Sequence, residues 1–154
     1  MAANLLVSFD MTLERNKDIA TRFIQEVFVK QDENAADELA SPDFTPHSWG
    51  PVGPGVENLK QAQRRVSAGL SDARMDIEDV IAEGDRVVVR LTSHGKHAGE
   101  FMGMPASGKE YAISEIHIFR IEDGKVAEHW RDADMLGLMQ QIGAMPAPAT
   151  TGSR

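Results

Sequence analysis

Hydrophobic residues in the first half of the chain recur every three or four positions, which is the spacing of an amphipathic helix. In the first of these stretches Ile19, Phe23 and Val27 form the apolar stripe, and Thr12 is the predicted N-cap. This spacing predicts three helices, over residues 12–30, 34–39 and 56–70. A short extended segment (residues 44–49) and the breaker-rich loop GPVGPG (residues 50–55) separate the last two.

After Ser71 apolar residues alternate with polar ones, as in a strand with one buried face. The alternation predicts four strands, over residues 74–83, 86–95, 110–122 and 125–132. A last helix over residues 135–142 and a disordered tail over residues 144–154 follow. Helices that precede an antiparallel sheet predict an α+β fold, in which a strongly curved sheet wraps the helices into a cone with an apolar interior. We expect one domain over residues 1–143.

The dipeptide Asp123-Gly124 is the strongest hairpin signal in the chain, and it predicts which side chains share a face of the sheet. If these residues form the turn, Glu122 lies opposite Lys125 and the register continues without a break. One face then carries Ile113, Glu115, His117, Phe119, Ile121, Val126, Trp130 and Asp132, with Asp134 if the strand runs on. The other face carries Ile116, Ile118, Arg120, Ala127, His129 and Arg131. A one-residue bulge would exchange the faces beyond it.

The first face is the candidate site, because an imidazole, an indole and two or three carboxylates lie there among large apolar residues. Buried polar groups cost free energy unless they are paired, so their concentration indicates a pocket. Two carboxylates in one pocket raise the pKa of one of them, as a general acid or base requires. Other interpretations stay open: a core role for His117, packing for Trp130, an N-cap role for Asp134, and solvent exposure for Glu128 and His129.

Composition argues against several classes of function. The chain has 24 Asp and Glu against 16 Lys and Arg, a formal net charge of -8, and Arg64-Arg65 is its only basic doublet. We therefore expect neither nucleic-acid nor membrane binding. The absence of cysteine removes disulfides and thiolate chemistry and fits a cytoplasmic location. No metal site is expected, because His94 and His97 have no acidic partner in register.

Six stretches, taken together, resemble the SnoaL-like polyketide cyclases, also called ester cyclases, in order and spacing over about residues 14–143. They are NKDIATRFIQEVF (16–28), SPDFTPH (41–47), AEGDRV (82–87), HAGEFMGMPASG (97–108), FRIEDGKVAEHW (119–130) and DMLGLMQQIG (134–143). The resemblance implies the nuclear-transport-factor-2-like cone fold. It also implies an enzyme without cofactor or metal that closes a ring of an aromatic, anthracycline-type polyketide ester by intramolecular aldol condensation.

The resemblance also assigns roles to residues. Asp134 matches the aspartate that acts as general acid and base, His47 matches a histidine that assists it, and His117 lies on the predicted pocket face. His97 matches a histidine of a loop expected to cover the pocket. The expected substrate-binding residues are Trp130, Glu115, Asp132, Arg131, Phe119, Phe23, Trp49, His97 and Met102. The charged pair Arg131-Asp132 departs from the family pattern, where many relatives carry an aromatic or aliphatic residue.

Two alternatives to the cyclase remain open at this point. One is a hydroxylase of an anthracycline precursor on the same scaffold, which uses a substrate carbanion and dioxygen, and the other is a binding module without turnover. As for partners, we expect an aromatic polyketide as the ligand. The apolar residues Ile116 and Ile118 on the outward face of the sheet predict a homodimer through packed sheets.

Overall fold

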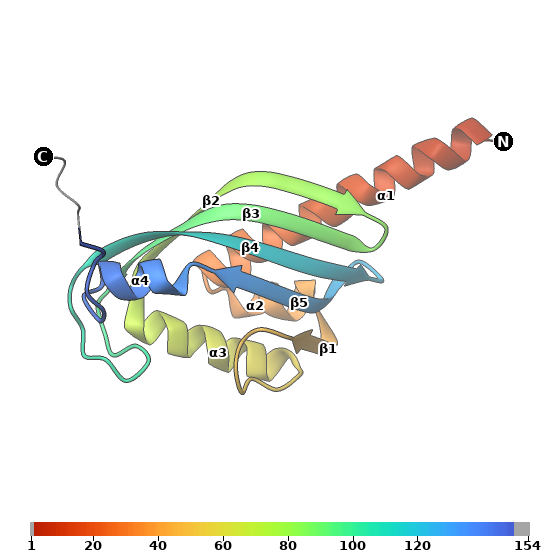
Figure 1. Cartoon of the computed structure of the whole chain (residues 1–154). Coiled ribbons are helices and arrows are strands. Elements are labelled where there is room, and N and C mark those ends of the chain that lie inside the picture. The colour runs from red at the N-terminus through yellow and green to blue at the C-terminus, as the bar shows by residue number, and fades with distance from the viewer. Residues whose placement is uncertain (1, 150–154) are drawn as a thin grey trace, which may run out of the picture.

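The computed structural model describes residues 2–149, so residues 150–154 of the predicted tail lie outside the described residues. In chain order the elements are α1 (Ala2–Arg22), the π-helix η1 (Phe23–Val29), α2 (Glu33–Leu39), β1 (Ala40–Pro46), α3 (Val56–Gly69), β2 (Leu70–Glu83), β3 (Arg86–His97), β4 (Glu110–Glu122), β5 (Lys125–Ala133) and α4 (Met135–Gln141) (Figure 1). Residues 144–149 form neither helix nor strand. No helix in the described part of the chain is both long and apolar enough to span a bilayer.

The sheet has the strand order β1-β5-β4-β3-β2 and confirms the α+β prediction. Strands β2 to β5 pair antiparallel in sequence order, whereas β1 pairs parallel with β5 at the edge. The turn between β4 and β5 is the predicted one, since Asp123 and Gly124 both have positive φ, of 51° and 75°. The long strands curve over α1 and α2, and α3 runs beneath them (Figure 1).

The predicted start of the first helix at Thr12 is wrong. The helix begins ten residues earlier, and the Thr12 hydroxyl donates a hydrogen bond to the Ser8 carbonyl inside it, at 3.0 Å. Residues 2–11 contain neither proline nor glycine, so nothing in them breaks a helix. In Figure 1 this added segment projects beyond the sheet, with Val7, Phe9 and Met11 exposed.

The main core lies between η1, α2 and the inner face of the sheet. Phe23 of η1 is at its centre, with ring centroids 5.8 Å from Phe44 and 5.7 Å from Phe119. All three side chains are fully buried. Phe23 and Phe119 were expected to bind substrate, but they are instead part of the packed core that supports the site.

A bulge in β5 overturns the predicted register of the last hairpin. Ile121 pairs with Val126 as expected, but Arg120 pairs with Glu128, so Ala127 is an extra residue in β5. Val126 and Ala127 are accordingly both buried. Beyond the bulge the side chains of β5 lie on the face opposite to the predicted one. His129 and Arg131 point inward, beside His117 and Glu115 of β4. Trp130 and Asp132 point outward.

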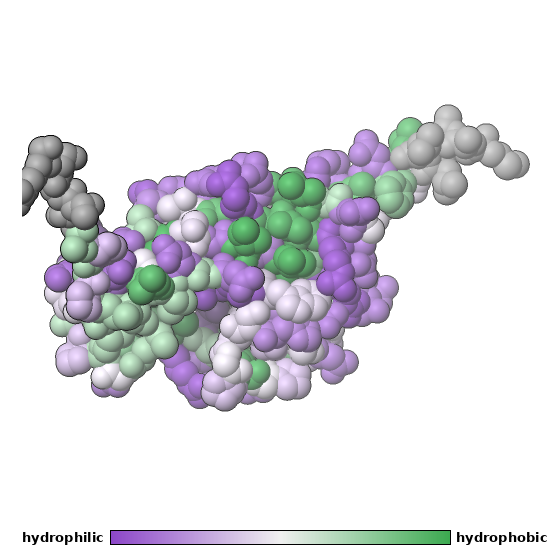
Figure 2. Space-filling model, in the orientation of Figure 1, coloured by the Kyte–Doolittle hydropathy of each residue, from purple (hydrophilic) through white to green (hydrophobic). Residues whose placement is uncertain are grey.

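The outward face of the sheet carries an apolar patch, which we call the outer-face patch. Four of its residues lie opposite one another across the strands from β2 to β5: Ile81, Val88, Ile118 and Trp130. The fifth, Ile116, lies two residues before Ile118 in β4. Ile81 and Ile116 are exposed. Figure 2 shows apolar side chains gathered over the strands on this face.

Candidate active site

A cavity of about 350 Å³ lies between the inner face of the sheet, α3 and α4. Its volume is in the range of small-molecule binding sites. Figure 2 shows a hollow in the surface between α4 and the loop that follows β1. Most of the lining side chains are apolar, among them Phe28, Trp49, Val66, Leu70, Met75, Phe101, Ile113, Met135 and Leu138.

Two of the charged residues that line the cavity form a bidentate ion pair. Arg131 of β5 donates from Nε and Nη2 to the two carboxylate oxygens of Glu115 of β4, each at 2.7 Å. The inner register of β4 and the bulge in β5 place these side chains together. The pair joins a buried Glu115 side chain to an Arg131 side chain that is 32% exposed. Such fork-to-fork pairing holds both side chains in one orientation.

A chain of hydrogen bonds continues from Glu115 into the protein. His117 Nε2 lies 2.9 Å from Glu115 Oε2, and His117 Nδ1 lies 2.9 Å from His129 Nε2. Trp49 Nε1 then donates to His129 Nδ1 at 3.0 Å. Because an indole can only donate, His129 Nδ1 carries no proton and Nε2 carries one. His117 therefore accepts at Nδ1 and donates from Nε2 to Glu115.

The protonation states follow from the same contacts. Burial by itself would raise the pKa of Glu115, but the hydrogen bonds from Arg131 and His117 outweigh it and lower the pKa to about 2. Burial lowers the pKa of His117 and, more strongly, that of His129. At neutral pH the site thus holds an ionised carboxylate, a guanidinium and two neutral histidines. Neither nitrogen of His117 is free to accept a proton from a ligand.

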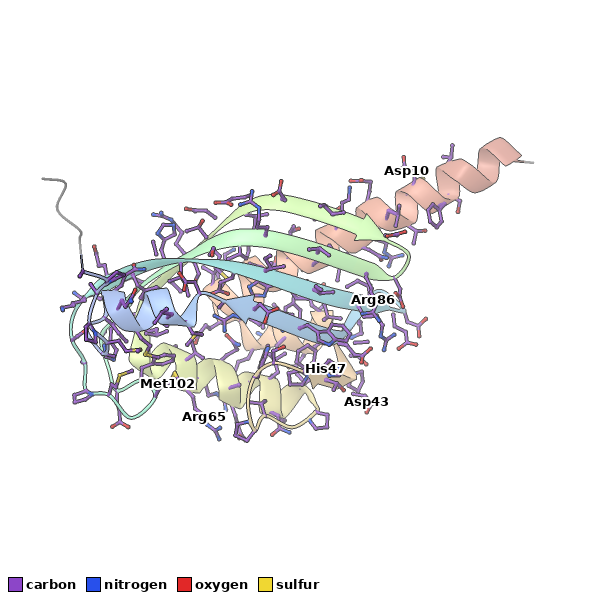
Figure 3. The ribbon with its side chains drawn as sticks, in the orientation of Figure 1. Asp10, Asp43, His47, Arg65, Arg86 and Met102 are labelled. Carbon is purple, nitrogen blue, oxygen red and sulfur yellow. The ribbon has the colours of Figure 1, made fainter. Side chains whose placement is uncertain are left out.

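Four of the predicted site residues line the cavity: Glu115, His117, Arg131 and Trp49. Trp130 and Asp132 do not, because the bulge turns them outward. On the outer face the Trp130 ring stacks on His47, with centroids 4.5 Å apart and planes 10° apart. His47 Nε2 also lies 2.9 Å from Glu128 Oε1. Figure 3 shows His47 at the same end of the sheet as Arg86. His47 is therefore outside the cavity lining.

The loop between β3 and β4 reaches the cavity through Phe101, not through the two residues expected from it. His97 is fully buried; its Nδ1 accepts a hydrogen bond from the backbone N–H of Ser107 at 3.2 Å, which holds the loop's end. Met102 is 66% exposed, in the loop at the lower left of Figure 3.

Asp134 lies just outside the cavity. Strand β5 ends at Ala133, and the Asp134 carboxylate caps α4 by accepting from the Gly137 N–H at 2.8 Å. Asp134 is exposed, while the next residue, Met135, lines the cavity. The prediction of several carboxylates in one pocket is therefore wrong: among the described lining residues Glu115 is the only one. Within residues 2–149 no three His, Asp or Glu side chains converge as metal ligands would.

Sequence reasoning missed His129, which was expected to face solvent and instead connects Trp49 to the ion pair. It also missed Arg65 of α3, which lines the cavity while remaining exposed; Figure 3 shows it pointing away from the ribbon. The adjacent apolar residues Val126 and Ala127 were the one local sign of the bulge, and they fit an unbroken strand equally well.

Comparisons with known proteins agree with this architecture. The family described as SnoaL-like polyketide cyclase matches residues 18–142. The nogalonic acid methyl ester cyclase of Streptomyces nogalater is 31% identical over 121 residues, covering 77% of this chain and 90% of that one. The aklanonic acid methyl ester cyclase DnrD of Streptomyces peucetius is 35% identical over 83 residues, 54% of this chain and 57% of that one, so the match spans little more than half of that relative. The structure of TsrD from Streptomyces laurentii has a TM-score of 0.78 at 32% identity, covering 86% of this chain and 97% of that chain.

Proposed function

Because the chain belongs to the SnoaL-like polyketide cyclase family, we propose that it closes a ring of an aromatic polyketide ester by intramolecular aldol condensation. The observation that carries this proposal is the cavity, which is largely apolar and has its polar groups gathered at Arg131, Glu115 and His117. A fused aromatic ring system with a few oxygen atoms suits such a site. The names of the relatives, methyl ester cyclases of nogalonic and aklanonic acid, support the same substrate class.

Apart from the new carbon–carbon bond, the condensation needs only proton transfers. A base removes a proton from a carbon next to a carbonyl group, and the resulting enolate carbon bonds to a ketone carbon of the same molecule. The ketone oxygen then takes up a proton and becomes a hydroxyl group. The product is an isomer of the substrate, and no oxidant or reductant is consumed, so we propose a reaction without a cofactor. Both reacting carbons belong to one substrate molecule, so the cavity contributes by holding that molecule in a conformation in which the two carbons are close together.

We propose Asp134 as the base that starts the reaction. The other candidate, Glu115, accepts three hydrogen bonds from Arg131 and His117 and has a pKa lowered to about 2, which makes it a weak base. Asp134 precedes the cavity-lining Met135 and has a single hydrogen bond, from Gly137. This role requires the Asp134 side chain to leave the cap of α4 and turn toward the cavity when the substrate binds.

The test is the mass of the product formed in air from an uncyclised anthracycline-type methyl ester. An isomer, or an isomer minus water, supports the aldol reaction, whereas a gain of one oxygen atom would identify a hydroxylase and overturn it. Tight binding without any product would indicate a binding module.

Asp134→Asn should abolish turnover and leave the fold intact, because asparagine also caps helices well. Asp132→Asn is the matched control, since Asp132 is two residues away and faces outward. Full turnover by Asp134→Asn would assign the base elsewhere.

A further inference from the structure

Arg131 uses only part of its guanidinium group in the ion pair with Glu115. Nε and Nη2 donate to the carboxylate, whereas Nη1 has no hydrogen-bond or ion-pair partner among the described residues. Nη1 carries two N–H groups and no acceptor. Arg131 lines the cavity, so these donors are available to a ligand in a wall that is otherwise mainly apolar.

The cavity carries a positive charge in a protein that is negative overall. Its charged lining residues, within the described part of the chain, are Arg131, Arg65 and Glu115, while the whole chain has a net charge of -8. The other titratable groups around Arg131 are His117, His129 and Tyr111, and all three are neutral at pH 7, since burial lowers the pKa of both histidines and raises that of the tyrosine. Among the described residues, Glu115 alone therefore offsets the charge of Arg131 directly.

We propose that Arg131 binds a negatively charged oxygen of the ligand through Nη1. The chemical class is the enolate or phenolate of an aromatic polyketide, and this identity rests on the function proposed above. A guanidinium that faces a largely apolar cavity interacts with an anion more strongly than one in bulk solvent does.

The hydrogen-bond chain behind Glu115 keeps Arg131 in position. Glu115 is held by His117, which is held by His129 and Trp49. Because both histidines are neutral, they orient the carboxylate without repelling the guanidinium. The donors of Nη1 therefore point to a fixed place before a ligand arrives, which reduces the cost of ordering them on binding.

In the aldol reaction this arrangement separates two tasks. The proton of the carbon acid goes to Asp134, and the electron pair of the broken C–H bond passes to the enolate oxygen, which accepts a hydrogen bond from Arg131. The carbon–carbon bond then forms at the ketone carbon, and the ketone oxygen takes the proton back from Asp134.

The test uses 1,2-dihydroxyanthraquinone, whose phenolate absorbs at a longer wavelength than its phenol. The absorption spectrum of the dye is recorded as a function of pH, once for the free dye and once for the dye bound to the wild-type protein. A cation within contact distance lowers the pKa of an acid by about 1 to 3. Because Glu115 offsets part of the charge of Arg131, we expect the pKa of the bound dye to fall by about 1. This shift corresponds to about tenfold tighter binding of the phenolate than of the phenol. Arg131→Gln should abolish this preference. Arg65→Gln removes the same charge at an exposed position and should keep most of it.

Glu115→Gln gives a second test that a purely structural role does not mimic. It removes the negative charge that offsets Arg131, so the preference for phenolate should increase. The double variant Glu115→Gln/Arg131→Gln leaves two neutral amides that can still bond to each other, and it should show no preference. A wild-type protein without a preference for phenolate, or an unchanged preference in Arg131→Gln, would overturn the inference.

Turnover separates this inference from the proposed function. If the protein binds the phenolate through Arg131 but does not cyclise the ester, the anion site stands and the aldol function fails. If the ester is cyclised equally well by wild type and Arg131→Gln, the function stands and the inference fails.

Discussion

The ion pair between Glu115 and Arg131 is unequally buried, and this predicts unequal costs for removing either partner. The Glu115 side chain is 2% exposed, against 32% for Arg131. Arg131→Met leaves a buried carboxylate with only the hydrogen bond from His117. Glu115→Gln leaves a cation that can turn toward water in the cavity. We therefore expect Arg131→Met to lower the free energy of unfolding more than Glu115→Gln does.

The loss in the free energy of unfolding caused by Arg131→Met has an upper limit, because the unpaired carboxylate of Glu115 can take up a proton. With an ordinary pKa of about 4.3, protonation costs about 1.4 kcal/mol per pH unit, hence about 4 kcal/mol at pH 7 and about 1 kcal/mol at pH 5. Breaking a buried ion pair by removing one partner costs about 3 to 5 kcal/mol, which agrees with the limit at pH 7. Glu115→Gln keeps a side chain that can form hydrogen bonds, and we expect it to cost about 1 to 2 kcal/mol.

Urea unfolding at pH 7 and at pH 5 measures these costs for the wild type, both single variants and the double variant. Arg131→Met should lose most of its excess cost at pH 5, and Glu115→Gln/Arg131→Met should be more stable at pH 7 than Arg131→Met alone, since it strands no charge. Equal costs for the two single variants would refute the argument from burial. A cost of Arg131→Met that is the same at both pH values would refute the argument from protonation.

Three further predictions follow from other contacts. Burial lowers the pKa of His117 and His129, so below about pH 6.5 the unfolded chain binds more protons than the folded one. The free energy of unfolding should therefore fall by up to about 1.4 kcal/mol per pH unit for each histidine. A melting temperature that is constant from pH 7 to 5.5 would contradict this. Trp49→Phe keeps an aromatic ring beside Phe28 but leaves His129 Nδ1 without its donor, and urea unfolding should show a loss of about 1 to 3 kcal/mol. The outer-face patch should join two copies of the chain, so light scattering should give a dimer for the wild type and a monomer for Ile116→Lys; a monomeric wild type would rule the dimer out.

Most of the fold could be predicted from local signals. The last hairpin was predictable because Asp123-Gly124 supplies the two positive φ values of a tight turn. The helix predicted over residues 34–39 agrees with α2 to within one residue, and in the structure the Asp32 side chain caps it by accepting hydrogen bonds from the N–H groups of Asn34 and Ala35. The start at Thr12 failed because a good capping residue marks a helix end only where the preceding chain is not helical, and residues 2–11 are helical.

The site was half predictable for a related reason. Strand β4 runs without interruption, so its alternation correctly placed Glu115 and His117 on the inner face. In β5 the extra residue is Ala127, which is small and apolar and follows another apolar residue. Such a sequence fits the buried face in either register, and only the packing of the whole sheet selects one. The positions of His129 and Arg131 were therefore beyond what local alternation can show.

This shift of the register by one residue changes the chemistry of the cavity. With an unbroken register Asp132 would join Glu115 inside, and mutual repulsion would raise the pKa of one carboxylate toward the range of a general acid or base. With the bulge Arg131 takes that place, and its hydrogen bonds together with the one from His117 lower the pKa of Glu115 to about 2 despite its burial. Glu115 is then a weak base, which supports our proposal that Asp134, just outside the cavity, transfers the proton instead. Asp134→Asn should accordingly stop turnover while the bound dye keeps its preference for phenolate, and Arg131→Gln should remove that preference.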